Sequence, residues 1–145
     1  MTVLDANILL YAYNADAPQH RAAAAWLEEL LEGSGIIGLS WATLWAFLRI
    51  STNGRVWPNP MSPRDAFAVV RRLLMQPDVV VLHPGPRHLE LLETLVAETG
   101  AIGPLVSDAA LAALAIEHGA QLASTDHDFS RFPTLRWLNP VPSAL

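Results

Sequence analysis

Residues 106–126 read VSDAALAALAIEHGAQLASTD, and this stretch decides the fold. Its first part has the apolar pattern of an α-helix and stops at Gly119, a residue type that commonly ends helices. A short apolar run at 121–123 follows, with the length of a buried parallel strand. A helix that leads straight into a buried strand is typical of a parallel α/β sheet.

Short apolar runs and helical patterns alternate over the rest of the chain as well. Strands are predicted at 2–4, 36–39, 79–82, 121–123 and 136–138. Helices are predicted within 17–33, 41–50, 61–76, 85–100 and 106–119. Strands that alternate with helices indicate a parallel sheet covered on both faces. The predicted fold class is therefore α/β, a three-layer α/β/α sandwich with a central, mostly parallel sheet.

Length and composition restrict the class of protein further. The 145 residues suffice for one compact domain and are too few for two ordinary ones, so a single domain over residues 1–145 is predicted, with a loose tail at 139–145. The hydrophobic content is 52%, yet no uncharged apolar run approaches the roughly eighteen residues of a membrane span. No basic region precedes an apolar stretch at the N-terminus, as it would in a secretory signal. A soluble, cytoplasmic protein without a membrane partner is expected.

Residue usage excludes several chemistries. Cysteine is absent, which excludes disulfides, thiolate metal sites and cysteine nucleophiles. All 9 basic residues are arginine, so no lysine can act as a nucleophile or phosphate clamp. The net charge of −5 argues against a broad basic surface for nucleic acid. A phosphate substrate would need metal ions or local arginines.

Three aspartates are predicted to meet at one edge of the sheet. Asp5 directly follows the strand at 2–4, and active sites of such sheets lie outside the carboxyl ends of the strands. Asp108 opens a helix of roughly eleven residues, which spans about 17 Å at 1.5 Å per residue. The strand at 121–123 runs back toward Asp126, so Asp108 and Asp126 should return to the same edge. Asp5 joins them if its strand is parallel.

This cluster predicts a metal site. Clustered carboxylates raise each other's pKa unless a cation neutralises them. Oxygen ligands favour Mg²⁺ or Mn²⁺ over Zn²⁺. Such ions cleave phosphodiesters because they polarise the phosphate and lower the pKa of an attacking water. Asp5, Asp108 and Asp126 are thus candidate metal ligands and catalytic residues. The alternative is that each acid, at the start of a helical pattern, serves only as a cap.

Three stretches of the chain resemble a known family. They are TVLDANILLYAYNAD at 2–16, SWATLWAFLRIST at 40–52 and SDAALAALAIEHGAQLASTDHDFSRFPTLRW at 107–137. Together they resemble a PIN domain, and more narrowly the VapC-type toxins of bacterial toxin–antitoxin pairs, over nearly the whole chain. The resemblance implies a Mg²⁺-dependent endoribonuclease that cleaves RNA, is inhibited by a cognate antitoxin and is usually a homodimer. It places the family's metal-binding acids at Asp5, Asp108 and Asp126.

Further positions also follow the family pattern. Asn7 matches a small polar residue that could hydrogen-bond a ligating carboxylate or water. Asp128 matches a frequent further acid, and as a local turn former it has an equally good structural interpretation. Arg49 lies on the apolar helix at 41–50, where it could contact phosphate or pair with an acid of the site.

One position departs from the family pattern. The family generally has an acidic residue where this chain has Ala46, and no Asp or Glu occurs from residue 33 to 64. The acidic quartet is therefore reduced to a triad, with Asp128 as a possible supplement, which puts a second metal in doubt.

Three other interpretations stay open from the sequence. The motif LDAN at 4–7 also resembles the first motif of haloacid-dehalogenase phosphatases, although Asn7 stands where that family usually has Asp. The loss of an acid at Ala46 supports a non-catalytic PIN module that binds a partner. The set of Trp41, Trp45 and Leu48 is predicted to belong to the core, with a dimer seam as the alternative.

Overall fold

The structure, a computed structural model, describes residues 1–142, so the end of the predicted tail, 143–145, lies outside the described residues. It contains a 5-stranded sheet in the order β3-β2-β1-β4-β5. The strands are β1 (Thr2–Leu4), β2 (Ile37–Leu39), β3 (Val79–Val81), β4 (Gln121–Ala123) and β5 (Trp137–Leu138). Every neighbouring pair is parallel, as predicted.

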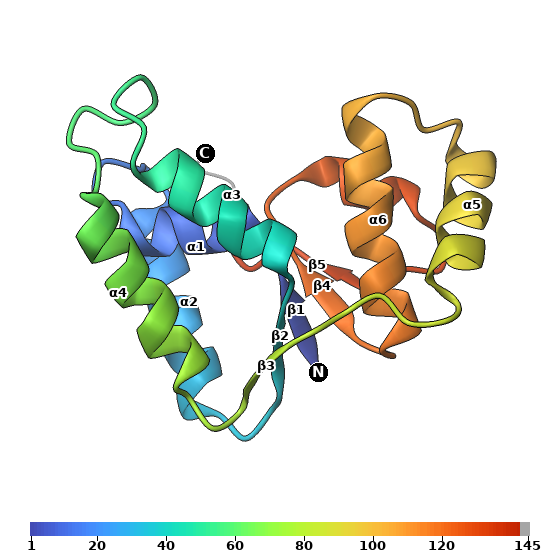
Figure 1. Cartoon of the computed structure of the whole chain (residues 1–145), viewed down its shortest axis with the longest axis horizontal. Helices are drawn as coiled ribbons and strands as arrows, with labels where there is room; N and C mark the ends of the chain where they lie inside the picture. The colour runs from blue at the N-terminus through green and yellow to red at the C-terminus, as the bar shows by residue number, and fades with distance from the viewer. Residues whose placement is uncertain (143–145) are drawn as a thin grey trace.

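Helices connect the strands in chain order. They are α1 (Ala6–Tyr13), α2 (His20–Glu32), α3 (Trp41–Ser51), α4 (Pro63–Leu74), α5 (His88–Thr99), α6 (Pro104–Glu117) and the short 3₁₀ helix η1 (His127–Arg131). In Figure 1, α1 to α4 lie on one side of the sheet and α5 and α6 on the other. The three-layer α/β/α prediction is confirmed.

The two hydrophobic cores follow from the alternation of side chains along each strand. Leu4 of β1 packs with α1 to α4, and its neighbour Val3 packs with α5 and α6 on the opposite face. Both residues are fully buried. The sheet is therefore covered on both faces, and its carboxyl edge is left for polar side chains.

Local hydrogen bonds fix where the helices next to this edge begin. Ser40 caps α3, because its hydroxyl accepts a hydrogen bond of 3.0 Å from Thr43 N. The Thr43 hydroxyl in turn donates to Leu4 O at 3.2 Å, which ties the start of α3 to the end of β1. The first turn of α3 is thus held directly beside Asp5.

The start of α6 differs from the prediction. Asp108 does not open this helix, because Gly103 adopts a positive φ of 60° and Pro104 follows at the first helical position. Asp108 therefore lies inside the helix, where a capping role is excluded. Asp5 and Asp126 do cap the elements that follow them, and their side chains accept from Ala6 N and Asp128 N.

The segment between β3 and α5 crosses the carboxyl edge of the sheet and is hydrogen-bonded to the end of α6. Glu117 accepts hydrogen bonds of 2.7 Å from Gly85 N and 2.9 Å from Arg87 N. These backbone donors, the first above all, lower the pKa of Glu117. In Figure 1 the segment runs from β3 below α3 toward α5, across the space between α3 and α6.

The prediction that Trp41 and Trp45 belong to the core is wrong. Their exposed fractions are 41% and 64%, whereas Leu48 packs partly buried against the core. A helix whose residues are apolar all around gives no periodic signal for which face is buried. Among the described residues, no helix is long and apolar enough to cross a membrane.

Candidate metal centre

The parallel pairing of the two central strands brings the candidate residues together. Leu4 of β1 pairs with Ala123 of β4, so Asp5 and Ser124 leave the sheet side by side. Asp5 N donates to Ala123 O at 3.0 Å, which extends the ladder by one residue. Asp126 follows two positions after Ser124. The register of the sheet therefore brings these two strand ends, and the acids that follow them, side by side.

The Asp5 carboxylate is held by three donors. Its Oδ1 accepts from Ala6 N at 2.7 Å. Its Oδ2 accepts from Ser124 Oγ at 2.7 Å and from Asn7 Nδ2 at 3.1 Å. The side chain is thus fixed in one orientation at the carboxyl edge of the sheet.

Ser124 connects the acids and was missed by the sequence prediction. Its side chain is fully buried. Besides donating to Asp5, its hydroxyl accepts from Asn7 Nδ2 at 3.0 Å and from Asp126 N at 3.0 Å. The available signal was a hydroxyl residue at the carboxyl end of a strand, two positions before Asp126.

Asn7 lies where a positioning role requires it. Its amide donates to Asp5 and Ser124, and its Oδ1 accepts from Thr125 N at 3.2 Å. Asn7 therefore links the start of α1 to the segment after β4, and holds the two halves of the site in register.

Three carboxylates converge next to this network. Asp108, Asp126 and Asp128 each offer an oxygen, and these atoms lie within 4.8 Å of one another. Asp128 N donates to Asp126 Oδ1 at 2.9 Å, and Arg131 Nε lies 3.5 Å from Asp128 Oδ1. This cluster contains Asp128 and does not contain Asp5, contrary to the predicted triad. Asp5 is linked to the cluster through the hydrogen bonds of Ser124.

The carboxyl groups repel one another. Burial, followed by the charges of Asp126, Asp5 and Asp128, raises the pKa of Asp108 to about 6. Burial also raises the pKa of Asp5, against the opposing hydrogen bond from Ser124, with a smaller contribution from Asp126. Negative charge is thus concentrated here without enough positive charge to balance it.

The donor set fits a hard divalent cation. It consists of carboxylate oxygens with neither thiolate nor imidazole, which favours Mg²⁺ or Mn²⁺. Burial and the neighbouring carboxylates raise the pKa of Asp108, and a divalent cation would neutralise this repulsion. Asp108, Asp126 and Asp128 would hold the ion, and the charge of Asp5 lies close enough to raise the pKa of Asp108.

A pocket opens beside the acids, between α3 and α6. Its cavity volume is about 500 Å³, and Asp5 and Asp108 lie in its wall. Ala46 lines the same pocket, so this position faces the site although it has no acid. Arg49, three residues farther along α3, is exposed and forms no ion pair within residues 1–142.

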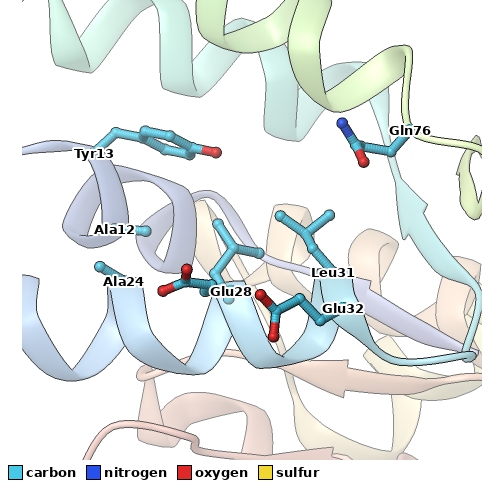
Figure 2. Close-up of a pocket in the computed structure, with 8 residues that line it drawn as sticks. Ala12, Tyr13, Ala24, Glu28, Leu31, Glu32 and Gln76 are labelled. Atoms are coloured by element: carbon cyan, nitrogen blue, oxygen red, sulfur yellow. The ribbon is translucent and has the colours of Figure 1, made fainter.

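A second hollow, of about 280 Å³, lies between α1, α2 and the end of α4. Figure 2 shows Glu28 and Glu32 of α2 on one side of it, and Tyr13 and Gln76 on the other. Burial raises the pKa of Tyr13 there. None of the candidate acids lines this hollow, so the first pocket is the candidate site.

The fold and the acidic edge together define a class of protein. The chain belongs to the PIN domain family, whose model matches residues 2–135.

Comparison with individual proteins narrows the relationship. The chain is 43% identical over 141 residues to a protein named Ribonuclease VapC33 from Mycobacterium tuberculosis, across 97% of this chain and 99% of that one. A structure of VapBC2 from Rickettsia felis, bound to a promoter DNA fragment, has a TM-score of 0.69 at 20% identity, over 95% of this chain and 97% of that one. A toxin-antitoxin complex from Klebsiella pneumoniae has a TM-score of 0.64 at 18% identity, over 97% of this chain and 98% of that one.

Proposed function

We propose that this protein is a metal-dependent endoribonuclease and the toxin of a toxin–antitoxin pair. The observation that carries the proposal is the convergence of Asp108, Asp126 and Asp128 in a PIN domain, next to a pocket that Asp5 and Asp108 line. The relative named as a ribonuclease, similar over almost the full length of both chains, supports it. Mg²⁺ or Mn²⁺ is the proposed cofactor.

Each side chain of the site has a separate role in the proposed reaction. A bound divalent cation supplies polarisation of the scissile phosphate and a lowered pKa for an attacking water. Asp108, Asp126 and Asp128 would hold that cation as carboxylates, and the nearby charge of Asp5 would add to their attraction for it. Asp5 stays oriented by Ala6 N and the Ser124 hydroxyl. Asn7 fixes this arrangement and needs no contact with substrate.

The proposal is tested by cleavage of a labelled single-stranded RNA with added Mg²⁺ or Mn²⁺. The variants Asp5→Asn, Asp108→Asn and Asp126→Asn keep the shape of each side chain and remove its charge. Each is expected to lower metal affinity and cleavage together, while Asp65→Asn on the far helix α4 leaves both unchanged. Full cleavage by the purified triple variant would contradict the proposal. Metal binding without cleavage in the wild type would favour a partner-binding module.

We also propose that the protein is a homodimer whose acidic pocket is closed by an antitoxin peptide that contains arginine. A guanidinium can bridge carboxylates where a cation would otherwise lie, so it would compete for the same oxygens. Light scattering is expected to give about twice the chain mass of 15.8 kDa. Adding the antitoxin should raise the Mg²⁺ concentration needed for cleavage. A monomer at micromolar concentration, or inhibition unchanged after the arginines are replaced, would contradict these two claims respectively.

A further inference from the structure

Two exposed tryptophans form part of the wall of the acidic pocket. The rings of Trp41 and Trp45 stack, with centroids 6.4 Å apart and an angle of 29° between their planes. Trp45 has the greater exposed fraction, 64%, against 41% for Trp41. The other three tryptophans, Trp26, Trp57 and Trp137, are partly buried. Exposed aromatic surface next to an active site is a feature that ligands use.

Arg49 continues the row along α3. Residues 41, 45 and 49 are spaced by four, so they lie on one face of the helix. Because α3 begins directly after β2, Trp41 is nearest the carboxyl edge, and Arg49 lies about 12 Å farther along the axis at 1.5 Å per residue. We call Trp41, Trp45 and Arg49 the tryptophan–arginine stripe.

The chemistry of the pocket wall favours a nucleobase over a phosphate. Among residues 1–142, no arginine lines the pocket, and its basic side chains are those of His83 and His88. From α3 the wall takes Trp41, Ala42, Trp45 and Ala46, with Thr43 as the one polar residue. Ala46, next to Trp45, keeps this wall free of negative charge. Such a wall offers aromatic faces for stacking, whereas the permanent positive charge of α3 lies outside the pocket, at Arg49.

We propose that the tryptophan–arginine stripe binds unpaired nucleotides of single-stranded RNA that lead away from the scissile phosphate. One base stacks on the Trp45 ring, and Arg49 contacts a phosphate beyond it. This inference rests on the proposed ribonuclease function, because the stripe is continuous with the pocket that holds Asp5 and Asp108. Stacking requires a free base face, so the stripe selects unpaired over duplex RNA.

The test measures binding separately from cleavage. Asp108→Asn protein that carries a second substitution is added to a fluorescein-labelled single-stranded RNA. The fluorescence anisotropy of the RNA then gives the Kd. Trp45→Ala is expected to weaken the Kd about tenfold, the change produced by losing one base–aromatic stack. Trp45→Phe should keep most of the affinity. Phe67→Ala, which removes a 51% exposed aromatic side chain from α4, is the matched control and should change the Kd less than about twofold.

Two further measurements identify the contacts. With an abasic oligonucleotide as the probe, Trp45→Ala should no longer weaken binding. Arg49→Gln should reduce the slope of log Kd against log salt concentration by about 0.7, whereas Arg71→Gln on α4 leaves the slope unchanged. An equal loss of affinity for the abasic probe would contradict stacking.

The outcomes separate this inference from the proposed function. Normal RNA cleavage by the wild type, with unchanged RNA binding by Trp45→Ala, would overturn the stripe alone. Absence of metal-dependent cleavage in the wild type would overturn the proposed function instead. If Trp45→Ala halves the mass by light scattering and RNA binding changes only with that mass, the stripe is a contact between copies of the chain and the inference is wrong.

Discussion

The hydroxyl of Ser124 lies 2.7 Å from Asp5 Oδ2 and donates a hydrogen bond to it, although 119 positions separate the two residues. The same hydroxyl accepts from Asn7 and from Asp126 N. One buried oxygen therefore orients both the Asp5 carboxylate and the backbone at Asp126.

Replacing Ser124 with alanine should destabilise the protein and disturb metal binding. The change leaves buried hydrogen-bonding groups of Asp5 and Asn7 unsatisfied, which costs about 1–3 kcal/mol of unfolding free energy. The lost hydrogen bond had lowered the pKa of Asp5, so that pKa rises further. Because metal binding needs the ionised carboxylate, the pH midpoint of Mn²⁺ binding should move upward.

Urea unfolding and Mn²⁺ calorimetry at several pH values check this prediction. Ser51→Ala is the control, since that hydroxyl is equally buried but donates to Phe47 O within α3. It should lower stability without moving the pH midpoint. An unchanged midpoint in folded Ser124→Ala protein would contradict a role for this residue in orienting Asp5.

Asp108→Asn should stabilise the metal-free protein at neutral pH. The folded-state pKa of Asp108 is about 6, against an ordinary value of 3.8. Between these pH values the Asp108 carboxyl is ionised in the unfolded chain and still protonated in the folded protein. The unfolding free energy of the wild type therefore falls as the pH rises through this range, and it stays lower at higher pH. The gain for the variant is about 1 kcal/mol near pH 7.5, less than the full shift implies, because solvent screens this partly exposed group.

Thermal unfolding in the presence of a chelator measures the effect of Asp108→Asn. Near pH 7.5, a gain of about 1 kcal/mol raises the Tm by about 2–4 °C. Near pH 4 the carboxyl is protonated in the folded protein, so the Tm should hardly change. Asp78→Asn, at an exposed position directly before β3, should leave the Tm unchanged at both. Equal Tm values for wild type and Asp108→Asn near pH 7.5 would show that Asp108 is not strained by its neighbours.

Divalent metal should stabilise the wild type and leave Asp126→Asn almost unaffected. A ligand present at a hundred times its Kd adds about 2.7 kcal/mol to the unfolding free energy. Thermal unfolding with increasing Mn²⁺ follows this gain, and Asp65→Asn should show it in full. A metal response in Asp126→Asn equal to that of the wild type would place the ion elsewhere.

Ala46→Glu should strengthen Mn²⁺ binding, because Ala46 lines the same pocket as Asp5 and Asp108. Without metal the added carboxylate increases repulsion, so the chelated variant should have a lower Tm than the wild type. Calorimetric Mn²⁺ titration of both proteins decides the matter, with Ala46→Gln as the uncharged control. Unchanged or weaker affinity in folded Ala46→Glu protein would mean that residue 46 does not reach the ion.

The positions of the strands, and the end of the sheet at which the acids emerge, could be predicted because they depend on local patterns. Strands 2–4 and 121–123 match the structure residue for residue. An aspartate placed just after a buried strand must emerge at its carboxyl end, and Asp5 and Asp126 do lie there. Their role as metal ligands stays a prediction.

Features that depend on tertiary contacts were not predictable in this way. The role of Ser124 arises from the pairing of Leu4 with Ala123, which no local pattern encodes. The exposure of Trp45 follows from which face of α3 packs on the core, and a helix without polar periodicity gives no sign of that. The earlier start of α6 had a local signal, Gly103 followed by Pro104, which the apolar pattern obscured.

The position of β1 between β2 and β4 has a consequence for biosynthesis. Asp5 is made 119 residues before its partner Ser124. Contacts so distant in sequence form late in folding, because the loop must close before they can stabilise the chain. A nascent chain therefore carries Asp5 without the other acids, and the proposed nuclease stays inert until Ser124 and the acids around it have been made.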